Sequence, residues 1–120
     1  MKTFCGTDIV KISRIKDLME NEKFLDKVYT DREIYYCKVN NMELKAQHFA
    51  GRFAAKEAIY KAIPNSKNVI KSWKSIEILA EDGIHTKPKV YIDGFYKENI
   101  DVSISHEKEY AIAMCIYEGE

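Results

Sequence analysis

The sequence has no surplus of charge of either sign and no long hydrophobic run. Nineteen basic residues balance nineteen acidic ones in a chain of 120 residues. Non-specific nucleic-acid binders usually carry a basic excess, because contacts with phosphate dominate their affinity, so no nucleic-acid partner is expected. The longest apolar run, residues 111–117, is far shorter than the roughly 20 residues that span a bilayer, so no membrane partner is expected either.

The N-terminus also lacks a secretory signal, and cysteine is scarce. Residues 1–4 show no basic segment followed by an apolar stretch, so a cytoplasmic protein is expected. The three cysteines, Cys5, Cys37 and Cys115, are widely separated and lie in apolar surroundings. Because no two of them have the spacing of metal ligands, the sequence predicts three buried free thiols.

Nothing in the sequence divides the chain. It contains no repeat, no low-complexity stretch and no Pro/Gly/Ser-rich linker, so residues 1–120 are predicted to form a single domain. The first half favours one strand followed by helices, and Thr30 and Glu33 form a capping box. The strand is expected over residues 4–10, and the helices over residues 13–20, 23–29, 30–37 and 42–63.

The second half of the chain has the two-residue alternation of strands. Strands are expected over residues 75–79, 89–92, 101–106 and 110–117, with a turn at 81–83. The last two strands are predicted to form a hairpin. Helices followed by strands indicate an α+β fold, with a small antiparallel sheet, one long helix and several short helices.

The predicted long helix carries an unusual set of charges. At about 100° per residue, one narrow apolar stripe is expected to face the core. Its members are Met42, Ala46, Phe49, Phe53 and Tyr60. Glu57 and Lys61 border this stripe on one flank. They form either an ordinary surface pair, worth a few tenths of a kcal/mol, or part of a functional site.

Asp8 is the second unusual charge, because it lies in a short apolar strand with the same parity as Phe4 and Val10. An ionised carboxylate in such a strand needs a partner or a ligand. One interpretation is pairing with a buried Lys or Arg. The other is that Asp8 and Glu57 together hold Mg²⁺, which usually takes one or two carboxylates plus phosphate oxygens and water.

The histidines are less informative. His106 ends an alternating strand just before a charged turn. It is either a structural hydrogen-bonding group or a donor to a phosphate oxygen. His48 and His85 show no pattern that indicates a function.

Three motifs combine these residues. They are Gly-Thr-Asp-Ile-Val at residues 6–10, Gly-Arg-Phe-Ala-Ala-Lys-Glu-Ala-Ile-Tyr-Lys-Ala at residues 51–62, and Val-Ser-Ile-Ser-His at residues 102–106, followed by Tyr110 and Ala111. In order, spacing and chain length they resemble the holo-[acyl-carrier-protein] synthase family, the compact bacterial type of 4′-phosphopantetheinyl transferase. The central motif is the most specific, and the resemblance covers essentially the whole chain.

The resemblance implies an enzyme of fatty acid biosynthesis. Such enzymes transfer the 4′-phosphopantetheine arm of coenzyme A to a serine of apo acyl carrier protein and release adenosine 3′,5′-bisphosphate. The family's fold, its dependence on Mg²⁺ and its homotrimeric assembly, with active sites at the subunit interfaces, are expected to apply here. The alternative is a module that binds coenzyme A or another diphosphate without chemistry.

The resemblance also assigns the catalytic residues. Asp8 and Glu57 correspond to the metal ligands of the family, and Lys56 and Lys61 to the lysines that flank the glutamate. Asp8, Glu57 and Lys61 are therefore the expected catalytic residues, and the two lysines are expected at coenzyme A. The group that accepts the serine proton is left open between Glu57 and a water on the metal.

The remaining assignments concern the substrates. Arg52 and His106 correspond to residues at the coenzyme A phosphates, and Arg14, with Lys16 nearby, to the surface that contacts the acidic carrier. The chain departs from the family at residues 63–67. Several relatives have a glycine-containing loop there, so the phosphate-facing loop is expected to differ.

Overall fold

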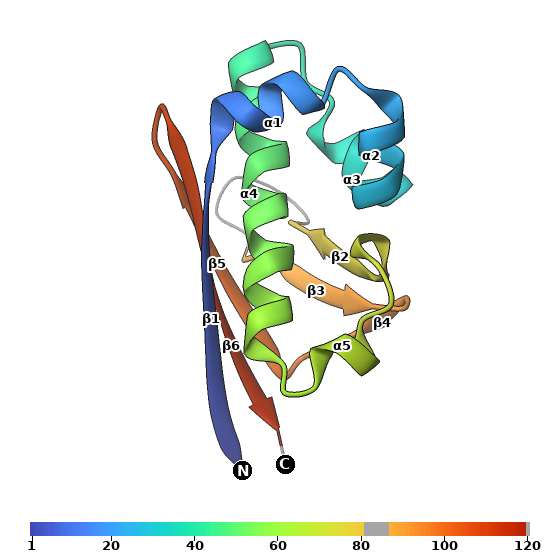
Figure 1. The fold of residues 1–120 in the computed structure, drawn as a ribbon, viewed down its shortest axis with the longest axis vertical. Coiled ribbons are helices and arrows are strands. Elements are labelled where there is room, and N and C mark those ends of the chain that lie inside the picture. Colours follow the sequence, from blue (N-terminus) through green and yellow to red (C-terminus); the bar gives the residue numbers. More distant parts are fainter. Residues whose placement is uncertain (81–86, 120) are drawn as a thin grey trace.

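The computed structural model describes residues 1–80 and 87–119, which fold into one long helix and two small sheets (Figure 1). The elements, in chain order, are β1 (Lys2–Lys11), α1 (Ile12–Leu18), α2 (Glu22–Val28), α3 (Asp31–Cys37), α4 (Met42–Ala62), α5 (Ser66–Val69), the 3-10 helix η1 (Trp73–Ser75), β2 (Ile76–Leu79), β3 (Lys89–Ile92), β4 (Phe95–Tyr96), β5 (Ile100–His106) and β6 (Tyr110–Gly119). The α+β prediction is confirmed. The turn predicted at 81–83 lies outside the described residues.

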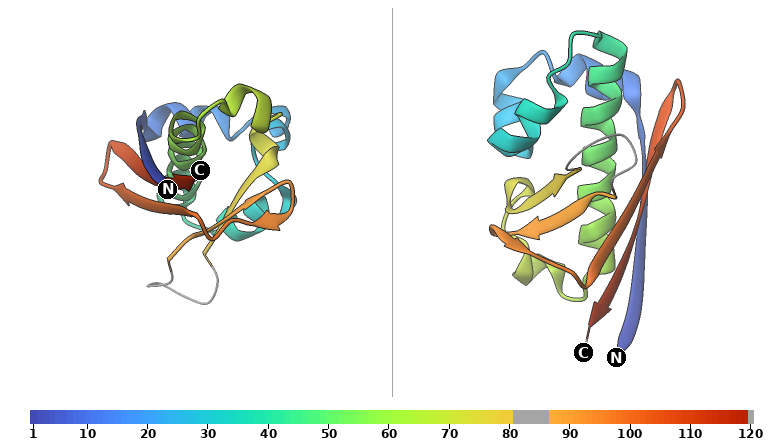
Figure 2. Two further views of the ribbon diagram at one scale, coloured as in Figure 1. Left: turned by 90° about the horizontal axis from the view of Figure 1, so that it is seen from below. Right: turned by 180° about the vertical axis from the view of Figure 1, so that it is seen from behind.

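The strands form two antiparallel sheets where the sequence predicted one. The first has the order β1-β6-β5 and the second the order β2-β3-β4. The predicted hairpin is present as β5 and β6, which pair from Ile100 opposite Tyr117 to His106 opposite Ala111. Strand β1 pairs with β6 along its whole length, so the first and last strands of the chain are neighbours. In Figure 2, α4 runs along one face of this sheet, and α1, α2 and α3 gather at one end of α4.

Helix α4 lies in the core of the fold. Asn41 caps its start by accepting a hydrogen bond from the Leu44 amide, and the helix ends before Pro64. The predicted apolar stripe is only partly correct, since Met42 is 43% exposed and Tyr60 is 39% exposed. Elements pack on several sides of the middle of the helix, so the buried surface there is wider than one stripe.

Strand β1 and helix α4 approach each other most closely at Gly6. A Cβ atom at this position would lie 2.1 Å from the Ala58 carbonyl oxygen and 2.8 Å from the Ala62 amide nitrogen. Both atoms belong to the backbone of α4, so neither can move aside without moving the helix. Glycine is therefore required for β1 to pack on α4 at this distance.

The cysteine prediction is correct for two of the three thiols. Cys37 and Cys115 are buried, and burial raises the pKa of each to about 12. Cys5 is exposed, because it points away from α4 on the outer face of β1. The described residues include no group of three or more side chains that could hold a metal ion. No described helix is both long and apolar enough to cross a bilayer.

The close approach at Gly6 leads to a prediction for stability. Gly6→Ala should lower the free energy of unfolding by about 3 kcal/mol or more, because the added methyl group overlaps the backbone of α4. Cys5→Ala, a neighbouring change on the exposed face of β1, is the control and should cost much less. Urea unfolding measures both, and equal stability of the two variants would contradict the proposed packing.

Candidate active site

Asp8 and Lys61 meet where β1 packs on α4. Asp8 lies on the same side of β1 as Gly6 and is half-buried. The Lys61 ammonium donates to Asp8 Oδ1 at 3.2 Å and to the Thr7 carbonyl oxygen at 3.0 Å. A carboxylate in an apolar strand needs a partner, and for Asp8 that partner is Lys61, which belongs to the second motif and lies on α4.

Glu57 lies close enough to Asp8 for the two carboxylates to repel each other. Burial raises the pKa of Glu57, and the negative charge of Asp8 raises it further. The positive charges of Lys61 and Arg14 oppose this rise in the Glu57 pKa. Residues from β1, α1 and α4 thus form one charged cluster, defined here as the Asp8 cluster: Asp8, Arg14, Glu57 and Lys61.

The two acidic residues of the Asp8 cluster fit a magnesium ion. Carboxylates are hard oxygen ligands, and Mg²⁺ usually takes one or two of them and completes its shell with phosphate oxygens and water. Two like charges in one half-buried place repel each other, and a divalent cation would relieve that repulsion. The protein therefore provides an anionic anchor that a phosphate-bound ion can use.

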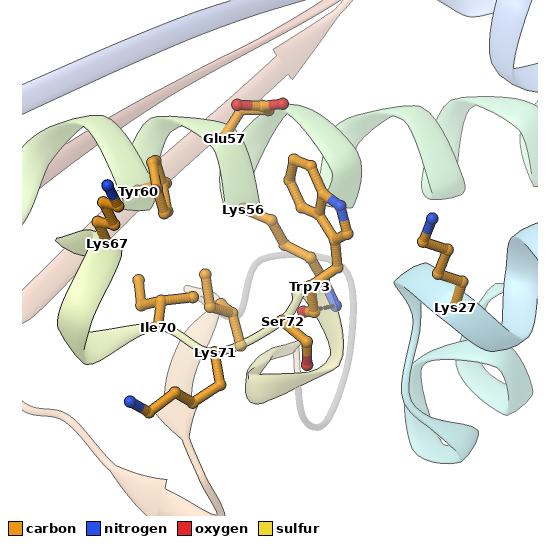
Figure 3. A pocket seen from close by; sticks show the side chains of 10 residues that line it. Lys27, Lys56, Glu57, Tyr60, Lys67, Ile70, Lys71, Ser72 and Trp73 are labelled. Atoms are coloured by element: carbon orange, nitrogen blue, oxygen red, sulfur yellow. Dashed lines mark hydrogen bonds between the residues drawn. The ribbon is translucent and has the colours of Figure 1, made fainter.

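A cavity of about 540 Å³ borders Glu57 (Figure 3). Its lining combines apolar and aromatic side chains, among them Tyr60, Ile70 and Trp73, with lysines from separate segments. Lys27 comes from α2 and Lys67 from α5, so positive charge approaches the opening from two sides. The cavity can accept an elongated ligand that has both an apolar part and negative charge.

Lys56 lies next to Glu57 in the sequence but has a different environment. Its ammonium is fully buried and donates to Glu33 Oε1 at 2.7 Å, the Val28 carbonyl oxygen at 2.7 Å and the Trp73 carbonyl oxygen at 3.1 Å. These acceptors use all three of its N–H groups. Burial lowers the pKa of Lys56, and the Glu33 carboxylate opposes that shift. This lysine therefore holds elements of the fold together, and its predicted contact with coenzyme A stays a prediction.

Arg52 and His106 form a second group, which does not include the acidic pair. Arg52 is only 6% exposed, and its Nε donates to the Ile78 carbonyl oxygen at 3.3 Å. His106 is exposed at the end of β5, and its charge acts on His48, as does that of Arg52. Burial lowers the pKa of His48, and the two residues that the resemblance assigned to the coenzyme A phosphates both lower it further through their positive charge.

The two residues predicted to contact the carrier lie on α1. Arg14 is exposed, with its guanidinium 5.9 Å from the centre of the Phe53 ring, and it also acts on Glu57. The Lys16 ammonium forms an ion pair with Glu43, so its charge is partly neutralised. Of this pair, Arg14 is the residue that joins the α1 surface to the Asp8 cluster.

The sequence did not identify Glu33, the partner of Lys56, or His48, the neighbour of Arg52, as residues near the site. Glu33 was identified only as part of the capping box, which is present, with Thr30 N donating to Glu33 Oε1 at 2.9 Å. Its ion pair with Lys56 joins residues 23 positions apart, and no local pattern signals it. His48 had no assignment, although it lies one helical turn before Arg52, a spacing that places side chains on one face.

The comparisons with known proteins agree with these motifs. A family model described as the 4′-phosphopantetheinyl transferase superfamily matches residues 4–115. The holo-[acyl-carrier-protein] synthase of Finegoldia magna is 41% identical over 117 residues, covering 97% of this chain and 96% of that relative. The Bacillus anthracis holo-(acyl-carrier-protein) synthase in complex with CoA (3′,5′-ADP) has a TM-score of 0.79 and 30% identity, covering 98% of this chain and 96% of that one.

A second solved structure, the Helicobacter pylori holo-[acyl-carrier-protein] synthase in complex with coenzyme A, has a TM-score of 0.71 at 27% identity. It covers 95% of this chain and 99% of that one. The Asp8 cluster, Arg52 and His106 all lie within the matched residues 4–115. The chain therefore belongs to the 4′-phosphopantetheinyl transferase superfamily and, within it, to the holo-[acyl-carrier-protein] synthases.

Proposed function

We propose that this protein transfers the 4′-phosphopantetheine arm of coenzyme A to a serine of an apo acyl carrier protein, with Asp8 and Glu57 holding Mg²⁺. The observation that supports this most directly is the meeting of these two acidic residues from β1 and α4. The cavity beside Glu57 gives the substrate room, and its lysines suit a phosphorylated ligand. The reaction serves fatty acid biosynthesis and takes place in the cytoplasm.

The transfer exchanges one phosphorus–oxygen bond for another. The serine oxygen bonds to the phosphorus that carries pantetheine, and the bond from that phosphorus to the bridging oxygen breaks. Adenosine 3′,5′-bisphosphate leaves with the bridging oxygen and its electron pair. Mg²⁺, when bound, supplies positive charge to the diphosphate as this negative charge develops.

The protein's own side chains supply charge and position. Lys61 lies next to Asp8 and brings a second positive charge to the phosphates, which stabilises the leaving group. Burial and Asp8 make the Glu57 carboxylate more basic than an exposed one. Glu57 or a water on the metal is the proposed acceptor of the serine proton. Arg52 and His106 are proposed to bind phosphate of coenzyme A.

The carrier is proposed to dock on α1 beside the Asp8 cluster. Acyl carrier proteins are acidic, and the exposed Arg14 offers a positive charge close to Glu57. Charge pairs at the rim of an interface mainly raise the rate of association. Lys16 adds less positive charge to this surface than Arg14 does, because its ammonium is paired with Glu43.

The active unit is proposed to be a homotrimer with its active sites at subunit interfaces. The face of the first sheet turned away from α4 carries exposed apolar side chains, with Ile9 61%, Ile112 47% and Met114 46% exposed. Ile9 and Ile112 are opposite each other on β1 and β6. An exposed apolar face of this kind suits contact with further copies of the chain.

The metal assignment predicts the effect of two substitutions. Asp8→Asn and Glu57→Gln should each lower the rate of transfer by about 100-fold or more, because each removes a carboxylate proposed to hold the Mg²⁺ that stabilises the developing negative charge. The readout is the intact mass of an apo carrier incubated with coenzyme A and Mg²⁺. Glu98→Gln, an exposed acidic residue just before β5, should behave as wild type. Full activity of either site variant, or activity without a divalent ion, would contradict the assignment.

The docking surface predicts a salt-dependent effect. Arg14→Glu should raise the KM for the carrier about tenfold at low ionic strength, and the effect should shrink as salt screens the charges. Lys2→Glu makes the same change of charge at the far end of β1 and should leave KM unaltered. If both variants have the wild-type KM, the carrier docks elsewhere.

The trimer predicts a mass in solution. Light scattering should give three times the mass of one chain for the wild type. Met114→Glu should give smaller species, because it places a charge on the apolar sheet face. A wild-type protein with the mass of one chain at micromolar concentration is the result that would exclude the trimer.

A further inference from the structure

Glu33 is a fully buried carboxylate that the proposed mechanism does not use. It lies on α3 and is not among the described residues that line the cavity beside Glu57. Its Oε1 accepts from the Lys56 ammonium at 2.7 Å and from the Thr30 amide at 2.9 Å, and its Oε2 accepts from the Ile78 amide at 2.9 Å. A buried charge with this many partners is held in one position.

Lys56 extends these contacts from Glu33 to two backbone carbonyls. Its ammonium donates to the Val28 carbonyl oxygen at 2.7 Å, at the end of α2, and to the Trp73 carbonyl oxygen at 3.1 Å, in η1. Because the ammonium has only three N–H groups and all are used, a shift of its position disturbs every one of these bonds. We call Glu33, Lys56 and the groups bonded to them the Glu33 network.

Each branch of the Glu33 network ends at or next to a residue that lines the cavity. Trp73 lines it directly, Lys27 precedes Val28 in α2, and Ile76 lies two positions before Ile78 in β2. In Figure 3, Trp73 stands beside Lys56, and Lys27 approaches from α2. The cavity wall therefore depends on a carboxylate that does not itself reach the cavity.

Trp73 is the part of this wall that the Glu33 network holds most directly. Its ring stacks on Phe53 of α4, with ring centres 5.4 Å apart and planes inclined by 21°. Its backbone is held separately, through the bond from Lys56. The side chain is half-buried and lines the cavity, so a change at its backbone alters the surface that a ligand meets.

The inference rests on the proposed function, in which this cavity receives coenzyme A. A displacement of about 1 Å in a group that positions a substrate can cost up to about 100-fold in rate. The carrier is proposed to dock on α1, which contributes no hydrogen bond to Glu33 or Lys56 within residues 1–80 and 87–119. A change in the Glu33 network should therefore affect coenzyme A more than the carrier.

We propose that Glu33 is a positioning residue for coenzyme A: through Lys56 it holds Trp73 and the adjoining cavity wall in the arrangement that binds this substrate. Glu33 is fully buried, so it acts through Lys56 and does not touch the substrate. Removal of its charge leaves the Lys56 ammonium buried without a counter-charge, a costly state that the surrounding backbone relieves by moving.

The test is steady-state kinetics of Glu33→Gln, with each substrate varied in turn. Glutamine has nearly the same size, but it is uncharged, and its single oxygen cannot replace two oxygens that accept from Lys56 and from the Ile78 amide. The KM for coenzyme A should rise about tenfold, while the KM for the carrier stays at its wild-type value.

Asp26→Asn is the matched control. It also changes a carboxylate with a lysine partner into an amide, but its ion pair with Lys74 is exposed. Exposed pairs contribute little, so both KM values should equal those of the wild type.

A second variant and a second measurement separate positioning from stability. Glu33→Asp keeps the charge on a shorter side chain and should also raise the KM for coenzyme A, by a smaller factor. Trp73 is the single tryptophan of the chain, so its fluorescence reports on the cavity wall. In folded Glu33 variants the emission of Trp73 should be shifted from that of the wild type, whereas Asp26→Asn should leave it unchanged.

The outcomes separate this inference from the proposed function. A structural role alone would reduce the amount of folded enzyme, so kcat would fall while both KM values stayed at their wild-type values. That result, or the failure of both Glu33 variants to fold, overturns the positioning role and leaves the transferase assignment standing. If the wild type neither transfers the arm nor binds coenzyme A, the proposed function fails and the inference fails with it.

Discussion

Strand β1 and helix α4 pack backbone against backbone at Gly6, and the candidate active site depends on this contact. With 2.1 Å between a Cβ at Gly6 and the Ala58 carbonyl oxygen, any larger residue would push the strand away from the helix. Asp8 follows two positions later on the same side of β1, so the close approach carries its carboxylate to Lys61 and Glu57. A packing constraint in the first motif thereby positions acidic residues from two distant parts of the chain. Close packing and the proposed metal site therefore depend on the same short segment.

The central motif divides its charged residues between two tasks. Glu57 and Lys61 face β1 and the Asp8 cluster, whereas Lys56 is turned into the interior against Glu33. A buried ion pair of this kind is stable only when its remaining hydrogen bonds are satisfied, and here Ile78 N and Thr30 N also donate to Glu33. The pair links α3, α4 and β2 close to the cavity and so supports the part of α4 that lines it.

Much of the fold could be predicted from the sequence because local signals determine it. The capping box at Thr30, the stop at Pro64 and the alternation of the last two strands lie within a few residues of what they control, and each is confirmed. The second sheet and the exposure of Cys5 depend on which elements pack together, and periodicity carries no information about that. The left-handed Asn65, with φ of 60°, lies in the 63–67 loop, which the resemblance predicted to differ from a glycine-containing one. Asparagine tolerates this conformation better than most residues, which explains how the loop can turn there without glycine.

For the site, the sequence alone left Asp8 open between a structural ion pair and a metal ligand; the structure shows the ion pair with Lys61, and the metal ligand stays a proposal. Asp8 pairs with Lys61, and burial and the negative charge of Asp8 raise the pKa of Glu57, so the proposed metal site would bring a cation to two carboxylates that repel each other. The positions of Arg52 and His106 relative to this cluster could not be predicted, because they depend on how β5 and β2 pack against α4.

The most direct measurement is an anomalous difference map from crystals grown with Mn²⁺ in place of Mg²⁺ and with coenzyme A. The account predicts a single strong peak between the carboxylates of Asp8 and Glu57, in contact with the diphosphate. A peak at any other place, or a diphosphate bound away from these two side chains, would contradict it.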